Sequence, residues 1–386
     1  MLVNHMTAQL TTTREERGET IAKLSGQINR VDDYTYTVKS QSHNGEYTIS
    51  KVDHEWICEC LDNKYRHVKC KHICAVEFSS LLRAEAKIRT ITPVQNLTEC
   101  IYCGSSNIVK NGVRKNKAGN IQVFLCHDCH RKFTSNIGFE KMKHNPQAVT
   151  SAMQLYFSGE SLRNTMESLR LLGVEVSYQT ISNWIKKYVN LMKSYVETIK
   201  PNVSDTWRAD ELYVKIKGDM KYLFALMDDE TRFWIAQEIA ETKYSHDART
   251  LFRAGVKVAG KKPMTLITDG LPAYHLAYMK EFWTLKKATR TEHIAHITLK
   301  GDRNNNKMER MNGEVRDREK VMRGLKTKKT PILTGYQLYH NYIRPHEGLE
   351  GKTPAEACGI KIEGENKWLT IIQNASHQTK VKSQNL

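Results

Sequence analysis

Long apolar segments are missing from this chain of 386 residues. No run approaches the roughly 20 apolar residues that a membrane-spanning helix needs, which excludes an integral membrane protein. The first ten residues also lack the basic and then apolar pattern of a signal peptide. We therefore expect a cytoplasmic protein of two or three globular domains, without membrane contact.

Acidic residues are scarce relative to basic ones. The chain has 42 aspartates and glutamates against 59 lysines and arginines, a formal net charge of +17. This excess is large for an enzyme of small neutral metabolites, and it favours a partner made of phosphates. We expect a nucleic acid, with a basic but unspecific surface as the alternative.

Cysteine is almost absent outside one stretch. Eight of the nine cysteines lie between Cys58 and Cys129. Without an export signal they should be reduced, so their spacing predicts metal sites before disulfides. The ninth, Cys358, has no thiol or histidine nearby and is expected to be a small buried residue.

The first cysteine cluster follows a predicted β-hairpin, formed by residues 33–38 and 46–52 around Asn44-Gly45. Its ligands form two close pairs, one at a turn and one at the start of a predicted helix, and can complete a tetrahedral zinc shell. Cys74 lies one helical turn after the third ligand and is an alternative fourth ligand. The pattern resembles the SWIM zinc finger, and its residues are Cys58, Cys60, Cys70 and His72.

The second cluster consists of two CxxC pairs separated by 22 residues that contain a predicted hairpin. This spacing resembles a zinc ribbon, and four protein ligands indicate a structural metal. Residues 110–143 hold eight basic and two acidic residues, so the ribbon offers phosphates a positive face. The ligands are Cys100, Cys103, Cys126 and Cys129.

Three helical segments follow, at residues 148–157, 161–172 and 177–199. The third begins at Ser177, a favourable N-cap. Two short helices before a longer one predict a helix-turn-helix for DNA binding, and a plain helical connector is the alternative. The recognition helix would expose Tyr178, Gln179, Ser182 and Asn183.

After residue 201 the pattern changes to strands. Strands are expected at residues 206–214, 221–227 and 233–239, then a helix over 245–259 and a buried strand over 264–270. This order is typical of an RNase H-like α/β domain. Asp269 ends the last strand, where open α/β sheets place their sites, and Asp210 lies in the first.

A third acid should come from a helix over residues 304–323. We favour Glu309 over Glu314, because five residues turn a helix by about 500° and direct Glu314 roughly 140° away. Asp228-Asp229 is interpreted as a hairpin turn with acids facing solvent. The face of Glu309 also carries Asn312, Gly313, Arg316 and Lys320.

Four motifs in this order resemble the DDE transposases of bacterial and archaeal insertion sequences, which belong to the retroviral-integrase-like, RNase H-like superfamily. The resemblance covers about residues 207–360. The motifs are Ala209-Asp210-Glu211, Ile267-Thr268-Asp269-Gly270, Asn305-Asn306-Lys307-Met308-Glu309-Arg310, and Tyr342-Ile343-Arg344-Pro345-His346 with Lys352-Thr353-Pro354-Ala355-Glu356-Ala357.

The resemblance implies a mixed five-stranded sheet with helices on both faces and a catalytic set of Asp210, Asp269 and Glu309. It implies two catalytic Mg²⁺ or Mn²⁺ ions, because hard cations prefer carboxylates. The two cysteine clusters separately predict two structural Zn²⁺ ions. The reaction would be cleavage of DNA at the ends of a mobile element and strand transfer into target DNA. Phosphate contacts are expected from Arg316, Lys320 and Arg323.

We thus predict a transposase that acts in DNA transposition, recombination and integration, as a homodimer or larger assembly on DNA and associated with the nucleoid. A silent DNA-binding protein derived from a transposase and an RNase H-type nuclease are the alternatives. The expected parts are a SWIM-like module at 1–87, a zinc ribbon at 88–143, a helix-turn-helix at 144–200, the catalytic domain at 201–360 and a tail without periodic structure at 361–386.

Overall fold

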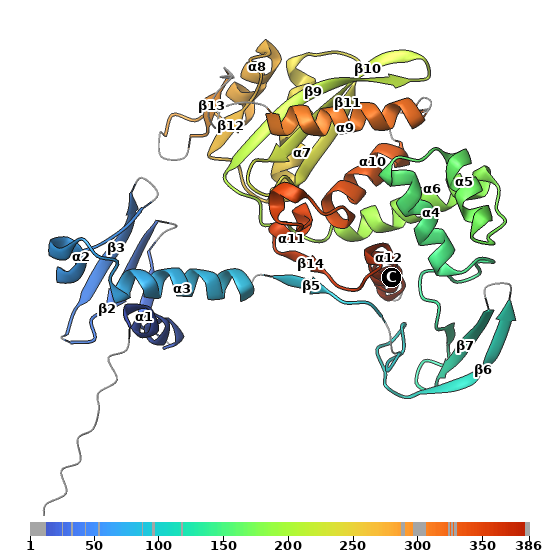
Figure 1. The fold of residues 1–386 in the computed structure, drawn as a ribbon, viewed down its shortest axis with the longest axis horizontal. Coiled ribbons are helices and arrows are strands. Elements are labelled where there is room, and N and C mark those ends of the chain that lie inside the picture. The colour runs from blue at the N-terminus through green and yellow to red at the C-terminus, as the bar shows by residue number, and fades with distance from the viewer. Residues whose placement is uncertain are drawn as a thin grey trace, which may run out of the picture. The chain divides into compact units, whose positions relative to one another are not determined.

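The computed structural model describes residues 13–24, 26–31, 34–42, 44–52, 55–86, 88–94, 97–116, 119–286, 290–295, 306–322, 325, 327 and 330–382. The chain divides into two compact units, Met1–Ile88 and Arg89–Leu386 (Figure 1). None of the described helices is long and apolar enough to cross a membrane.

The first unit is a four-stranded antiparallel sheet with helices. The predicted hairpin is confirmed, because β2 pairs with β3 in antiparallel register. The sheet order is β1-β2-β3-β4, and helix α1 packs against α3. The elements are α1 (Arg14–Lys23), β1 (Ile28–Arg30), β2 (Thr35–Lys39), β3 (Glu46–Val52), β4 (Glu55–Cys58), α2 (Leu61–Arg66) and α3 (Lys71–Ala86).

The second unit begins with a short strand, a three-stranded antiparallel sheet and three helices. The helices lie where the sequence predicts them, and Asn145, Ser161 and Ser177 accept the N-terminal backbone hydrogen bonds as caps. The elements are β5 (Arg89–Ile91), β6 (Ile108–Asn116), β7 (Gly119–Cys126), β8 (Lys132–Thr134), α4 (Pro146–Ser158), α5 (Leu162–Leu171) and α6 (Tyr178–Val196).

A mixed five-stranded sheet forms the centre of the second unit, which confirms the expected RNase H-like α/β class. Its order is β11-β10-β9-β12-β13, with β9, β10 and β11 antiparallel and with β12 and β13 parallel to β9. The strands are β9 (Thr206–Ile216), β10 (Asp219–Asp228), β11 (Trp234–Ala240), β12 (Thr265–Ile267) and β13 (Glu292–Ile294).

Helices cover both faces of this sheet, as expected. On one face lies α7 (Ser245–Ala259), so close that a Cβ on Gly255 would meet the side chains of Leu226 and Trp207. Helix α8 (Pro272–Glu281) packs beside α7. On the other face α9 (Asn306–Met322) crosses β9 (Figure 1).

The C-terminal segment differs from the expected tail without periodic structure. Helix α12 (Lys367–Lys382) buries Trp368, Ile371 and Ile372, and it packs against α6. That apolar spacing of three and four residues is a helical signal, which the polar composition of the segment hid. The other elements are α10 (Pro331–Leu338), a π-helix (Tyr339–Ile343), a 3₁₀ turn (Glu347–Leu349), α11 (Pro354–Ala357) and β14 (Ile360–Ile362), which pairs with β5.

Candidate active site and metal centres

Asp210 lies in the middle of the central strand β9, with a side chain that is only 9% exposed. Its Oδ1 accepts a hydrogen bond from the backbone N–H of Glu211, at 2.9 Å. Its Oδ2 accepts one from Nδ2 of Asn312 on α9, at 2.8 Å. The carboxylate is therefore fixed from the strand and from the helix that crosses it.

Asp269 is exposed and lies two residues after the end of β12, the strand parallel to β9, rather than at the end of the strand as the sequence predicts. Gly270 allows the chain to turn there, with φ +87°, and a Cβ on it would lie 2.6 Å from the carbonyl oxygen of Ala295. The backbone N–H of Leu271 donates to Oδ1 of Asp269. A side chain at position 270 would therefore push the turn after Asp269 away from the backbone of Ala295.

Asp210 and Asp269 lie close together just beyond the last residue pair of the β9–β12 ladder. Strand β12 ends at Ile267, opposite Arg208, so Asp210 comes two residues beyond the last pair of the ladder. Carboxylate oxygens of Asp210, Glu211 and Asp269 lie within 4.8 Å of one another. The sheet order changes direction between β9 and β12, which is where open α/β sheets bind their ligands.

Glu309 lies in the first turn of α9 and is exposed. It is outside the group of oxygens within 4.8 Å, but its charge contributes to the electrostatics of Asp210. Glu314 instead accepts two hydrogen bonds from the Arg344 guanidinium, at 2.5 and 3.0 Å. Since Glu314 is engaged there, Glu309 is the acid of α9 that remains near the aspartates.

The electrostatics of this cluster favour a bound cation. Burial, followed by the charges of Glu211, Asp269 and Glu309, raises the pKa of Asp210 to about 7. Charges that repel one another in a partly buried place are stabilised by a divalent ion, and carboxylate oxygens suit Mg²⁺ or Mn²⁺. The residues present therefore fit the metal ions that the sequence predicts.

The sequence analysis missed the side chains that support the two aspartates. Glu211 and its partner Lys243 are 32 residues apart, and no local pattern links them. The one feature of the sequence that indicates a role for Glu211 is its position directly after Asp210. The sequence places Asn312 on the same helix face as Glu309, but its contact with Asp210 depends on how α9 crosses the sheet.

The turn acids Asp228 and Asp229 form a turn as predicted, but the expectation that they face solvent is wrong. Asp228 is fully buried and accepts hydrogen bonds from the backbone N–H and hydroxyl groups of Ser204 and Thr231. Asp229 binds Arg208 at 2.5 Å and Lys307 of α9 at 2.8 Å. Both acids thus hold the turn and the start of α9 in place.

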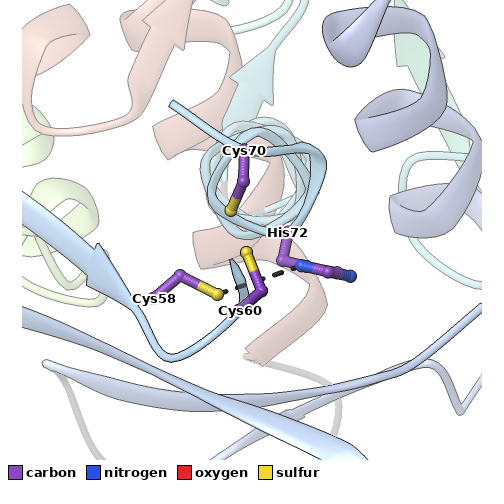
Figure 2. Close-up of side chains that lie close together, drawn as sticks. All are labelled: Cys58, Cys60, Cys70 and His72. Carbon is purple, nitrogen blue, oxygen red and sulfur yellow. Dashed lines mark hydrogen bonds between the residues drawn. The ribbon is translucent and has the colours of Figure 1, made fainter. Parts of the chain in front are cut away.

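The first cysteine cluster is brought together in the first unit. Ligand atoms of Cys58, Cys60, Cys70 and His72 lie within 4.8 Å of one another, all four residues being buried (Figure 2). Sγ of Cys58 lies 3.9 Å from Nδ1 of His72. Cys74, the alternative fourth ligand, is outside this group. It packs against Gly18 of α1, so closely that a Cβ on Gly18 would lie 2.5 Å from the Cβ of Cys74.

The second cluster is brought together at the base of the β6–β7 hairpin. Sγ atoms of Cys100 and Cys129 are 3.6 Å apart, as are those of Cys103 and Cys126. These separations are close to the ~3.8 Å edge of a tetrahedron with 2.3 Å zinc–sulfur bonds. The clusters suggest zinc, while their SWIM and ribbon identities stay predictions.

The residues expected to contact DNA lie on two surfaces. Tyr178, Gln179 and Asn183 are exposed on α6, and Ser182 is half-buried there. Arg316 and Lys320 are exposed on α9, with Lys320 paired to Asp317 at 2.7 Å. Arg323 lies outside the described residues.

Comparison with known proteins bears on the central sheet. A family model described as a DDE domain, of the IS240 transposase type, matches residues 204–346. The chain is similar to the transposase for insertion sequence-like element IS431mec of Staphylococcus aureus, 26% identical over 230 residues, 58% of this chain and 98% of the relative. An uncharacterised 48.3 kDa protein of insertion element ISM1 from Methanobrevibacter smithii is 25% identical over 191 residues, 45% of this chain and 46% of the relative.

Among solved structures, the catalytic core domain of HTLV-2 integrase in complex with magnesium is similar, with 16% identity and a TM-score of 0.29. The match covers 42% of this chain and 98% of that chain.

Proposed function

We propose that this protein, whose residues 204–346 form a DDE-type transposase catalytic domain, is the transposase of an insertion sequence. It would bind the ends of its element, cleave strands there and transfer them to target DNA. The observation that carries the proposal is the meeting of Asp210 and Asp269 at the open end of two parallel strands, beneath the helix of Glu309.

The chemistry follows from the donor set. Two Mg²⁺ or Mn²⁺ ions, when bound, would activate the attacking oxygen and stabilise the leaving oxygen of a phosphodiester. Asp210, Asp269 and Glu309 are the proposed residues that would hold them. Asn312 keeps the Asp210 carboxylate oriented through its 2.8 Å hydrogen bond, and Gly270 allows the turn after Asp269 to pack against the backbone of Ala295.

DNA binding is proposed to divide between two surfaces. The exposed residues Tyr178, Gln179 and Asn183, with Ser182 beside them, would read base edges of the element's ends. Arg316 and Lys320 on α9, together with Arg323, would hold phosphates above the carboxylates. Joining two ends requires at least two active sites, so we propose a homodimer or larger assembly on DNA in the cytoplasm.

The two cysteine clusters are proposed to bind one structural zinc ion each. Each offers four ligands from the protein, which leaves no open position for a substrate. The first unit has a small core built around Cys58 and Cys70 themselves, so a metal there would stabilise the whole unit.

A transposition assay tests the proposal. A donor plasmid would carry a marker gene between the DNA segments that flank this gene on either side, with the protein supplied separately. We expect the wild type and Asp219→Asn, an exposed acid on the same sheet, to move the marker. Asp269→Asn should abolish movement, and movement at the wild-type rate in that variant would contradict the proposal.

A further inference from the structure

Glu211 is an acid of the active-site cluster that the catalytic set of three does not include. Its side chain is only 5% exposed, although it stands beside the open end of the sheet. One oxygen, Oε1, accepts a hydrogen bond from Nζ of Lys243 at 2.7 Å. The other, Oε2, is buried without a hydrogen-bond partner in the described part of the chain. An orphaned buried carboxylate oxygen is costly, so it points to a missing ligand.

The position of Glu211 places its carboxylate beside the two aspartates. Consecutive strand residues normally face opposite sides of a sheet, yet Glu211 and Asp210 have oxygens within 4.8 Å of each other and of Asp269. Both can turn toward the gap because β12 ends at Ile267, before reaching them. Burial, and next the charges of Glu211 and Asp210, raises the pKa of the Tyr274 hydroxyl. This hydroxyl is close enough to Glu211 for a hydrogen-bonding contribution to that pKa, but no hydrogen bond of normal geometry joins the two groups among the described residues.

Lys243 holds Glu211 and balances part of the charge. Its Nζ lies 5.2 Å from the ring centroid of Tyr213 and 5.0 Å from that of Tyr222, two rings that pack at 4.8 Å. Cation–π contacts of this kind fix an ammonium group without supplying a second anion. Among the described residues, Lys243 is the one cation paired with these three carboxylates, so two negative charges remain for a metal to balance.

We propose that Glu211 is a fourth carboxylate of the metal site, binding a divalent cation through Oε2 while Lys243 holds Oε1. This inference rests on the proposed function, because it needs the metal site of Asp210 and Asp269. A salt bridge with a purely structural role would have no reason to leave Oε2 buried and without a hydrogen bond in a carboxylate that lies next to two others.

Binding of Mn²⁺ to the full-length protein, measured by electron paramagnetic resonance at pH 8 without DNA, tests the proposal. Glu211→Gln should weaken binding about ten-fold, a typical effect of removing a group that supports a metal site. Lys243→Met should bind Mn²⁺ at least as tightly as the wild type, because the competing positive charge is gone. Glu241→Gln, which removes a 58% exposed acid paired with Lys221, is the control and should leave the affinity unchanged.

The outcomes separate this inference from the proposed function. Wild-type affinity in Glu211→Gln, with binding lost in Asp210→Asn, would overturn the role of Glu211 and leave the catalytic site intact. Equal weakening in Glu211→Gln and Lys243→Met would overturn it too, since the pair would then act only as a structural support. Unchanged binding in Asp210→Asn as well would contradict the metal site itself.

Discussion

Removing the charge of Asp210 should make the metal-free protein more stable while it destroys activity. The pKa of this carboxyl rises from 3.8 to about 7 on folding, because the group is buried beside Glu211, Asp269 and Glu309. A raised carboxyl pKa contributes stability that is present below pH 3.8 and is lost as the pH rises through about 7. At pH 8 the wild type has lost this contribution to its stability, because Asp210 is ionised. Asp210→Asn has no charge at this position and therefore does not lose stability in this way.

The size of the effect follows from the same shift. About three pH units at roughly 1.4 kcal/mol each set an upper limit of about 4 kcal/mol. The asparagine has one carbonyl oxygen in place of two carboxylate oxygens, so one of the hydrogen bonds from Glu211 and Asn312 is lost, at a cost of about 1 kcal/mol. We expect a net stabilisation of about 2 to 3 kcal/mol at pH 8, shrinking toward pH 4.

Urea unfolding in buffer without added Mg²⁺ or Mn²⁺, followed through the tryptophans of the central sheet, measures this difference. Saturating Mn²⁺ should then stabilise the wild type, by about 2.7 kcal/mol at a hundred times Kd, but not the variant. Asp228→Asn is the matched control, because that carboxylate is buried with four hydrogen bonds and should lose stability on the same substitution. An Asp210→Asn protein less stable than the wild type at pH 8 would refute the reasoning.

Three further predictions concern the rest of the chain. Elemental analysis should find two zinc ions per chain and one after Cys70→Ser, and a content of one in the wild type would remove one of the proposed centres. Neutralising Arg316 and Lys320 should weaken binding alike on specific and random DNA and lower the salt slope by about one unit per contact, whereas altered sequence preference at an unchanged slope would reverse the roles of α6 and α9. Gly270→Ala should lower Mn²⁺ affinity, because a Cβ would lie 2.6 Å from the carbonyl oxygen of Ala295, and full affinity would show that this turn does not position Asp269.

Much of the fold could be predicted because its signals are local. The strand-like segments at residues 206–214 and 221–227, and the capped helix after Ser177, are each recognisable within one stretch of the chain. The cysteine clusters could also be predicted from local patterns, because the four ligands of each cluster lie within one short stretch of the chain. Strand β13 could not, because three residues carry too little pattern and only pairing with β12 defines them.

The surroundings of the active site could not be predicted from local patterns. Lys243 reaches Glu211 from 32 residues away, and Asn312 reaches Asp210 from 102 residues away. Asp228 resembled a solvent-facing turn acid, yet the chain before β9 folds over it and supplies Ser204 as a donor. Contacts of this kind depend on the tertiary packing of the sheet and its helices.

Strand transfer by the purified protein tests the central claim most directly. A labelled duplex carrying a terminal repeat of the element would be incubated with target DNA and Mg²⁺. We expect cleaved and joined products from the wild type and Asp219→Asn, and none from Asp210→Asn, Asp269→Asn or Glu309→Gln, all of which should still bind the duplex. Joined products at the wild-type level from any one of these three variants would contradict the assignment of the catalytic carboxylates.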